Sequence, residues 1–135
     1  MIDASVSWLL DYDIQMTPTA VVRSQLDQVG YPTALRLRAG GTWTRDDLAA
    51  SLHWSHVSDY ADSAGTNIDA WNTADLMFTW RPSTRTLEGL SLSLGVQNLF
   101  DADPPFHNGF TGYGFDAGQA NQLGRVVSLQ LIRRW

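Results

Sequence analysis

Hydrophobic and polar residues alternate at every second position through most of this chain. From residue 90 to 97, four aliphatic side chains fall on one face of the segment, and small or polar residues fall on the other. A repeat of two is the repeat of a β-strand. Six segments follow this pattern and are predicted to be strands: 2–16, 33–43, 48–60, 72–80, 90–97 and 125–135.

The predicted strands are long. Every even position from 2 to 16 is apolar, and every odd position except Leu9 is polar. Strands of soluble proteins average about 5–6 residues, whereas a tilted strand that crosses a membrane needs about 9–11. A helical repeat would instead place Arg36, His53 or Asp75 within an apolar stripe. The chain is therefore expected to be all-β, with strands long enough for a membrane barrel.

The connections between the predicted strands alternate in length. Segments 17–32 and 61–71 are long, 44–47 and 81–89 are short, and 98–124 is the longest. An antiparallel membrane barrel with long outer loops and short periplasmic turns has this rhythm, because every second hairpin end lies on the same side. The rhythm predicts that 98–124 is external and that residue 135 lies at the periplasmic rim.

Aromatic residues fall near the predicted strand ends. They are expected to form two girdles at the membrane interfaces, with the apolar rows facing lipid between them. The polar rows, including Arg36, Arg38, His53 and Asp75, would then face a wet lumen, whereas in a soluble sandwich they would face solvent. The girdle residues are Trp43, Trp80 and Trp135 at the short-turn ends and Tyr60, Trp71 and Phe100 at the long-loop ends.

Composition and charge exclude several classes of function. The chain has 9 basic residues, all Arg and scattered, against 14 acidic residues, so no basic patch favours nucleic acid. It has no Cys, which removes disulfides and thiol chemistry. No run of 18 apolar residues and no secretory signal is present. If the protein belongs outside the inner membrane, the chain is expected to be the later part of a longer precursor or a truncated reading frame.

The last third of the chain carries a resemblance to a known family. Residues 94–101 read LGVQNLFD, and Pro104-Pro105, a Gly/Tyr-rich loop, Gly124-Arg125 and a strand with a terminal aromatic follow. This combination resembles the carboxy-terminal end of TonB-dependent outer-membrane receptors. The resemblance is strong after residue 90 and weak before residue 71. The motif residues that carry it are Asn98, Leu99, Phe100, Asp101, Gly124 and Arg125.

The resemblance implies an architecture. Such receptors are 22-stranded antiparallel barrels closed by an amino-terminal plug, so residues 1–135 would be the last six strands of the barrel domain. The plug, the segment that contacts TonB and about sixteen strands would lie outside this chain. Asn98 and Asp101 are expected to form turns in which their side chains bond loop backbone, and Gly124 is expected to permit close strand approach. A fragment with two unpaired edges is not expected to fold alone as a stable soluble monomer.

The resemblance also implies a function and partners. The parent protein would import a scarce ligand, such as an iron-siderophore, across the bacterial outer membrane with TonB and the proton-motive force. Its partners would be outer-membrane lipid, the remaining strands and plug, TonB through the missing region, and the barrel assembly machinery. That machinery would read the last strand, although Arg133 interrupts the apolar row and Trp replaces the commoner Phe. The residues of this assembly signal are Val127, Leu129, Leu131 and Trp135.

The glycine-rich loop at 109–114 lacks the Lys-Ser/Thr of a phosphate loop and is predicted to be a mobile external loop. Its aromatic residues can contact either a ligand or neighbouring loops. They are Phe106, Phe110, Tyr113 and Phe115.

Metal and catalytic chemistry find little support. His53 and His56 are three positions apart, which places them on opposite faces of a strand, and His107 stands alone. The aspartates of the last loop lack the spacing of a calcium loop and suit turns better. No G-x-S-x-G elbow is present. No cofactor is expected, and enzyme activity ranks last.

Two alternatives remain open at this point. One is a soluble six-stranded barrel or sandwich that binds a small apolar ligand. The other is the end of a different outer-membrane barrel, such as a porin or an autotransporter, which would share the alternation but not the stretch from Asn98 to Asp101.

Overall fold

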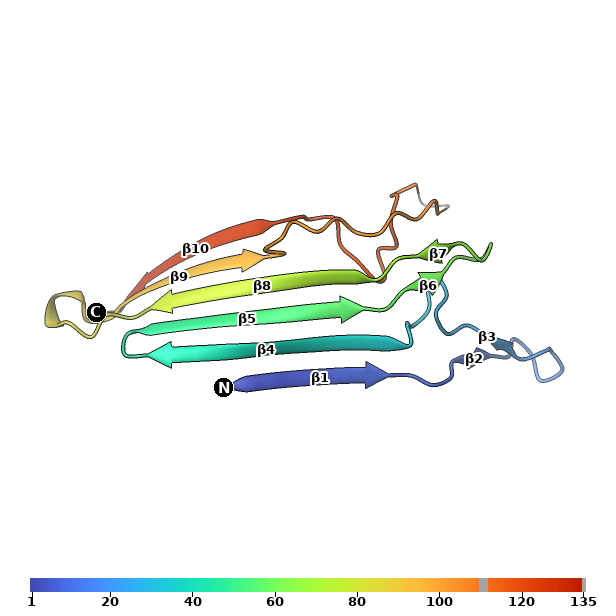
Figure 1. The fold of residues 1–135 in the computed structure, drawn as a ribbon, viewed down its shortest axis with the longest axis horizontal. Coiled ribbons are helices and arrows are strands. Elements are labelled where there is room, and N and C mark those ends of the chain that lie inside the picture. Colours follow the sequence, from blue (N-terminus) through green and yellow to red (C-terminus); the bar gives the residue numbers. More distant parts are fainter. Residues whose placement is uncertain (110–111, 135) are drawn as a thin grey trace.

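The computed structural model describes residues 1–109 and 112–134. The described chain is all-β and is dominated by one antiparallel sheet of six strands (Figure 1). These strands are β1 (Ile2–Trp8), β4 (Leu35–Arg45), β5 (Leu48–Val57), β8 (Trp71–Trp80), β9 (Leu90–Gln97) and β10 (Val126–Arg133).

The sheet is a simple meander. Its strand order is β1-β4-β5-β8-β9-β10, so each long strand pairs with the next long strand along the chain. Among the described residues, β1 and β10 pair on one side only, and the sheet is not closed. Two small ladders and a short 3-10 helix lie in the connections: β2 (Asp13–Ile14) with β3 (Arg23–Ser24), β6 (Tyr60–Ala61) with β7 (Asn67–Ile68), and η1 (Arg85–Leu87).

The strand register gives the sheet an apolar face. Residues that pair across neighbouring strands share a face, and Trp43, Ala50, Phe78, Leu94 and Leu129 form one such row. Polar residues on this face lie near the strand ends. The apolar face comprises Ile2, Ala4, Val6 and Trp8 of β1; Leu35, Leu37, Ala39 and Trp43 of β4; Leu48, Ala50, Leu52 and Trp54 of β5; Ala74, Leu76, Phe78 and Trp80 of β8; Leu90, Leu92, Leu94 and Val96 of β9; and Val127, Leu129 and Leu131 of β10.

The opposite face is polar. Arg38 pairs with Ser55, and His53 pairs with Asp75. Its polar residues are Asp3, Ser5, Ser7, Arg36, Arg38, Thr42, Thr44, Ser51, His53, Ser55, Thr73, Asp75, Thr79, Ser91, Ser93, Gln97, Ser128 and Gln130. Six apolar residues share this face: Ala49, Val57, Trp71, Met77, Val126 and Ile132.

The first predicted strand is too long. Residues 2–16 alternate throughout, yet β1 ends at Trp8, and the amide of Leu9 makes the last bond, to the carbonyl oxygen of Ala34 (2.9 Å). The partner strand β4 begins at Leu35, so residues beyond Leu9 have no strand to pair with in the sheet. They form part of the small β2–β3 ladder instead. The other five predicted strands agree with the structure within three residues at each end.

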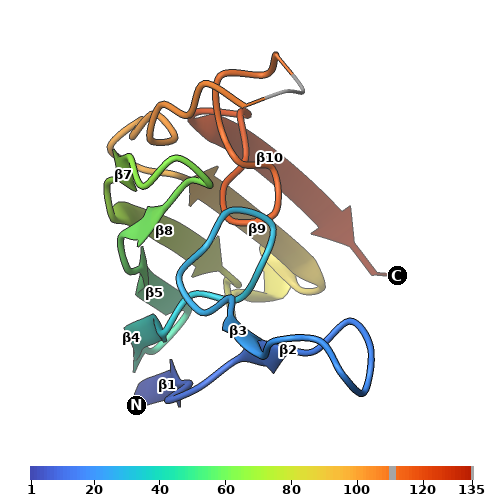
Figure 2. The same ribbon diagram turned by 90° about the vertical axis from the view of Figure 1, so that its right-hand side faces the viewer.

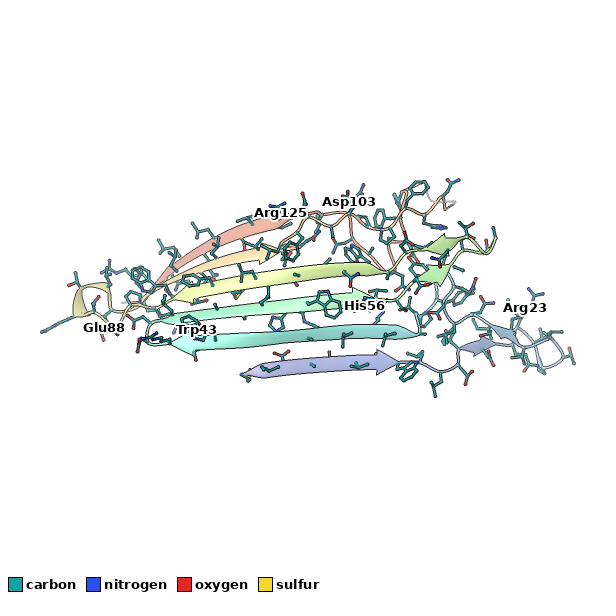
Figure 3. All side chains as sticks on the ribbon, viewed as in Figure 1. Arg23, Trp43, His56, Glu88, Asp103 and Arg125 are labelled. Carbon is teal, nitrogen blue, oxygen red and sulfur yellow. The ribbon has the colours of Figure 1, made fainter. Side chains whose placement is uncertain are left out.

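The alternation of connection lengths is confirmed. The long connections 9–34, 58–70 and 98–125 lie at one end of the sheet, and the short ones, 46–47 and 81–89, lie at the other (Figure 1). Trp43 and Glu88 mark the short-connection end, and Arg23 lies far out at the long-connection end (Figure 3). We call the three long connections together the loop cap.

The sheet forms a single layer. Viewed from the long-connection end, the strands follow an open arc, and the only other sheets that the described residues form are the two-stranded ladders of the connections (Figure 2). Large side chains on the apolar face are consequently open to the surroundings, with Trp8 and Leu129 more than two-thirds exposed. Most of the buried side chains belong to the loop cap, namely Thr33, Tyr60, Ile68, Asn98 and Asp116, whereas Ala74 is buried in β8. No helix among the described residues is long and apolar enough to cross a membrane.

Candidate functional site

A network of charged and polar side chains crosses the polar face near its middle. The Arg38 guanidinium donates to the Ser55 hydroxyl (2.9 Å) and lies 3.7 Å from the Asp75 carboxylate. The other oxygen of Asp75 accepts the backbone amide of Asn98 (3.0 Å). On the same face, the His53 ring of β5 lies 3.5 Å from the Asp3 carboxylate of β1. Arg38, Ser55 and Asp75 therefore tie β4, β5 and β8 to the start of the last loop, and the pair of Asp3 and His53 separately joins β1 to β5.

The loop cap is fastened over this face by Asp116. Its carboxylate is buried and accepts hydrogen bonds from the amides of Gly118 (2.9 Å) and Gly30 (3.4 Å). The Tyr60 hydroxyl donates to the same carboxylate. Because Gly30, Tyr60 and Asp116 come from three different long connections, one carboxylate holds all three together. Burial, reinforced by the negative charge of Asp116, raises the pKa of Tyr60 to about 12.

The first two long connections are also joined by backbone bonds. Asp27 adopts a positive φ of 55°, and its carboxylate accepts the amide of Ala34 (2.6 Å). Its carbonyl oxygen accepts the amide of Ala61 (2.8 Å), while the amide of Val29 donates to the carbonyl of Ala61 (3.0 Å). These bonds satisfy backbone groups that would otherwise be orphaned in the interior of the cap.

A groove of about 380 Å³ lies between the polar face and the last loop. Arg36, Arg38, Asp75 and Trp71 line its wall. On the loop side, Gln119 accepts a hydrogen bond from Arg36 through its side-chain oxygen, and its side-chain amide donates to the carbonyl of Tyr31 (2.7 Å). The last loop is therefore held against the sheet as well as against the first loop.

The first half of the sequence motif forms a tight turn at the end of β9. Asn98 adopts a positive φ of 49°, and its side chain both accepts the amide of Ala102 (2.9 Å) and donates to the Ala102 carbonyl (2.9 Å). Asn is among the few residues with a Cβ that tolerate this backbone conformation. The next residue, Leu99, donates its amide to the carbonyl of Ala74 (2.7 Å), which continues the pairing of β8 and β9. Phe100 is largely exposed.

The second half of the motif joins that turn to the start of β10. Asp101, at φ 56°, accepts the amide of Arg125 (2.6 Å) and lies 3.6 Å from the Arg125 guanidinium. Gly124 has φ 60°, and a Cβ there would lie 3.0 Å from the Asp101 carboxylate. The expectation that Asn98 and Asp101 bond backbone through their side chains is confirmed. Gly124 is expected from the sequence to permit a close strand approach, but the group near it is the Asp101 side chain and not a neighbouring strand. Residues that are 24 positions apart thus close the final hairpin.

Three of the four predicted loop aromatics lie near one another. The rings of Tyr113 and Phe115 are 6.3 Å apart, and Phe106 lies beside Gly114. The amide of His107 donates to the carbonyl of Gly114 (2.9 Å), which closes this loop segment. Phe106 and Tyr113 are mostly exposed. Phe110 lies outside the described residues.

The proposed assembly signal lies on the sheet edge. Val127, Leu129 and Leu131 share the apolar face of β10 and are all mostly exposed. Arg133 lies opposite Leu90, at the short-connection end of the same face. Trp135 lies outside the described residues.

The expected outer girdle is wrong for two residues. Trp71 pairs with Val57 and so lies on the polar face, and Tyr60 is buried in the loop cap. The aromatic residues that lie toward the long-connection end of the apolar face are Trp8 and Trp54. At the other end, Trp43 and Trp80 lie on the apolar face as expected.

The histidines occupy separate environments. His53 and His56 lie on opposite faces, as their spacing predicts, and Nδ1 of His56 is 2.8 Å from the side-chain oxygen of Asn72. No cluster of three or more His, Cys, Asp or Glu side chains that can hold a metal occurs among the described residues.

Sequence reasoning missed the contacts that hold the cap. Tyr60 continues the alternation of its segment, which predicts a girdle position, and Asp116 resembles any other loop aspartate. The signal that was present was the pair Asp116 and Gly118, since an aspartate two residues before a glycine often accepts that glycine's amide. Gly30 and Tyr60, which contact Asp116 from the other two long connections, have no feature in their local sequence that predicts this contact.

Comparisons with protein-family models, with curated proteins and with solved structures found no match for this chain.

Proposed function

We propose that this chain is the carboxy-terminal portion of the barrel of a TonB-dependent outer-membrane receptor. In this proposal the apolar face contacts lipid, the polar face lines the lumen, and the loop cap faces the cell exterior. The sheet continues into further strands beyond β1 and beyond β10. The parent protein imports a scarce ligand such as an iron-siderophore.

The observation that carries the membrane part is the single-layered sheet with one continuous apolar face. A soluble protein buries such a face against a second layer, and exposed apolar patches of this extent mark interaction surfaces. Its central strands β4, β5 and β8 are 11, 10 and 10 residues long, matching the roughly 9–11 that a membrane strand needs. The soluble sandwich would need a second sheet, for which the described residues supply only two-residue strands.

The distribution of polar residues on the apolar face supports the same orientation. Arg45 and Arg133 lie at its short-connection end, and the bonded pair His56 and Asn72 lies toward the long-connection end. Charged residues are costly near the bilayer centre and tolerated near the interfaces. Trp43 and Trp80 at one end, and Trp54 toward the other, suit interfacial positions.

The receptor part of the proposal rests on the resemblance of the motif from Asn98 to Asp101 and of Gly124-Arg125. This motif distinguishes the receptor class from porins and autotransporters, which share only the alternation of apolar and polar residues. The in-frame sequence upstream of Met1 tests it. We expect about sixteen more alternating strands, a plug and a TonB-contacting segment; a frame that encodes a plugless barrel would contradict it.

Membrane location has its own test. An epitope-tagged parent protein should fractionate with the outer membrane and shift in apparent mass between unheated and boiled gel samples, as folded barrels do. Recovery in the soluble fraction, with no heat-dependent shift, would contradict the membrane assignment whatever the upstream frame encodes.

A further inference from the structure

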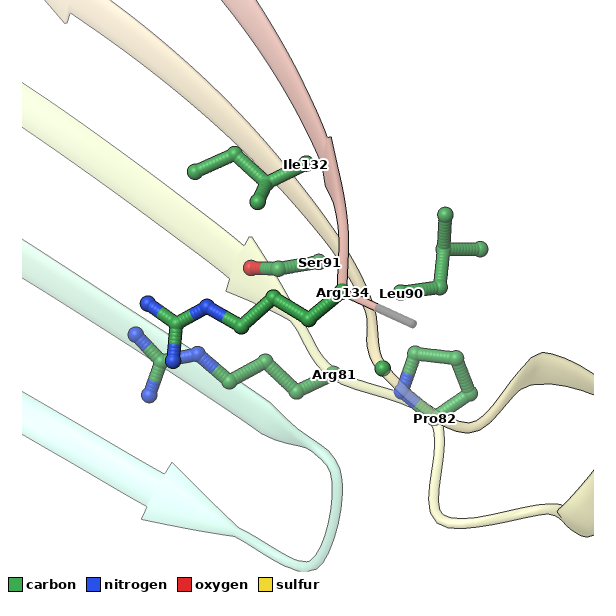
Figure 4. A pocket seen from close by; sticks show the side chains of 7 residues that line it. Arg81, Pro82, Leu90, Ser91, Ile132 and Arg134 are labelled. Carbon is green, nitrogen blue, oxygen red and sulfur yellow. The ribbon is translucent and has the colours of Figure 1, made fainter.

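Two arginines converge at the short-connection end of the polar face. Arg81 follows β8 and Arg134 follows β10, and both line one pocket of about 490 Å³ together with Ser91 of β9 (Figure 4). Figure 4 shows the two guanidinium groups extending in the same direction across this pocket. Three adjacent strands thus deliver two positive charges and a hydroxyl to one place.

Hydrogen bonds hold the main chain of both arginines at the end of the sheet. The amide of Arg81 donates to the carbonyl of Asp47 (2.8 Å), and the amide of Arg134 donates to the carbonyl of Gly89 (2.9 Å). Gly89 has φ 77°, and a Cβ there would collide with the Arg134 carbonyl, so only glycine allows this approach. The main chain therefore places the two residues at nearby strand ends, from which both side chains reach one pocket.

The charges in the pocket are uncompensated by its walls. The other lining residues are Pro82, Gly89, Leu90 and Ile132, and none is acidic. Among the described residues, no carboxylate lies within ion-pair distance of either guanidinium; the nearby Asp47 carboxylate accepts the amide of Ser83 (3.0 Å). The chain as a whole carries a net charge of −5, so this concentration of positive charge runs against its overall balance.

We propose that Arg81, Ser91 and Arg134 form a binding site for a phosphate-type oxyanion. Guanidinium groups present paired N–H donors that match the oxygens of such an anion, and a hydroxyl supplies a further donor. An anion between the two arginines also removes the repulsion of two like charges in one pocket. The argument for this site does not use the proposal that the parent protein is a TonB-dependent receptor.

Titration calorimetry with inorganic phosphate tests the site, with the full chain in detergent micelles and ionic strength held constant with chloride. We expect wild-type binding that weakens about tenfold or more in Arg81→Gln and in Arg134→Gln, because each loses charge-assisted hydrogen bonds. Arg85→Gln, in the same connection but outside the pocket, is the matched control and should bind within about twofold of wild type. Absence of phosphate binding beyond that of chloride, or an equal loss in Arg85→Gln, would overturn the proposal.

A conservative variant separates a folding defect from a lost contact. Arg81→Lys keeps the charge but not the fork of donors, so it should fold like wild type and bind between wild type and Arg81→Gln. Equal binding by Arg81→Gln and wild type would overturn the site.

A second experiment, with a phospholipid, distinguishes a free phosphate anion from a lipid headgroup as the ligand. Micelles doped with phosphatidylglycerol should show no loss of lipid association in the double variant Arg81→Gln/Arg134→Gln, because the pocket opens on the polar face. A lipid association that depends on both arginines would overturn the assignment to a free anion and would also count against a lumenal polar face.

Discussion

At the scale of single residues, side-chain oxygens that bond backbone amides shape the loops. Asn98, Asp101 and Asp27 each adopt a positive φ, and each bonds loop backbone through its side chain. Positive φ costs free energy for a residue with a Cβ, and these bonds offset that cost. The motif that resembles a receptor family therefore has a physical role here, which is to close the final hairpin.

Replacing Asn98 tests that role. Asn98→Ala should lower the free energy of unfolding by about 1–3 kcal/mol, because it removes both bonds to Ala102 and leaves a residue ill-suited to positive φ. Asn98→Gly should lose less, since glycine accepts the backbone conformation. Urea unfolding in detergent micelles measures both, with the exposed Asn108→Ala as control. Equal stability of Asn98→Ala and wild type would refute the role.

The buried phenol of Tyr60 predicts a dependence on alkaline pH. Its pKa is raised from 10.0 to about 12, so the contribution of the neutral phenol is complete below pH 10 and is lost as pH rises through 12. Absorbance at the tyrosinate band should show one of the four tyrosines titrating late. Tyr60→Phe should remove that late phase and nothing else. A late phase that survives in Tyr60→Phe would show that another tyrosine is responsible.

At the scale of elements, the alternating pattern identified all six strands of the sheet, and pairing decided where they end. Segment 2–16 has the two-residue repeat of a strand over its whole length. It extends beyond the residues of β4 with which it can pair, since β4 begins at Leu35. Local sequence contains no information about the length of a distant neighbour, which explains why strand existence was predictable and one strand boundary was not. The contacts among the loops, such as Tyr60 with Asp116, were unpredictable for the same reason.

Adjacent glycines of β4 offer a controlled test of the register. A Cβ on Gly40 would lie 2.7 Å from the Leu52 carbonyl oxygen and would also meet the His53 ring, whereas a Cβ on Gly41 would meet only an ordinary contact at 3.6 Å. Gly40→Ala should therefore cost about 1–3 kcal/mol by overpacking. Gly41→Ala should be neutral or slightly stabilising. Urea midpoints in micelles compare the two, and equal midpoints would contradict this register.

At the scale of the whole molecule, most of the buried residues and the apolar surface lie in different places. Most of the buried side chains belong to the loop cap, while the sheet keeps its apolar face open and, among the described residues, pairs each edge strand on one side only. Composition could not reveal this, because 44% hydrophobic residues suit a soluble core equally well. Strand length and the rhythm of the connections favour a sheet with an open apolar face, but neither feature predicts the burial of Tyr60 and Asp116 in the loop cap.

This arrangement predicts the behaviour of the isolated chain. In detergent-free buffer it should lack a cooperative unfolding transition and should self-associate through its apolar face and open edges. Detergent above its critical micelle concentration should restore a cooperative transition, followed by circular dichroism and by sedimentation. A sharp transition of a monomer in plain buffer would contradict the prediction.

The central claim is that one face of the sheet meets lipid and the other does not, and the absence of native cysteine makes a direct test possible. Single cysteines placed along β8 and β9, including Leu76→Cys, Thr79→Cys, Ser93→Cys and Leu94→Cys, can carry an environment-sensitive fluorophore in liposomes with a lipid-borne quencher. We predict a repeat of two, with blue-shifted and quenched emission at Leu76 and Leu94 and water-like, unquenched emission at Thr79 and Ser93. Uniform emission and quenching along both strands would contradict the claim.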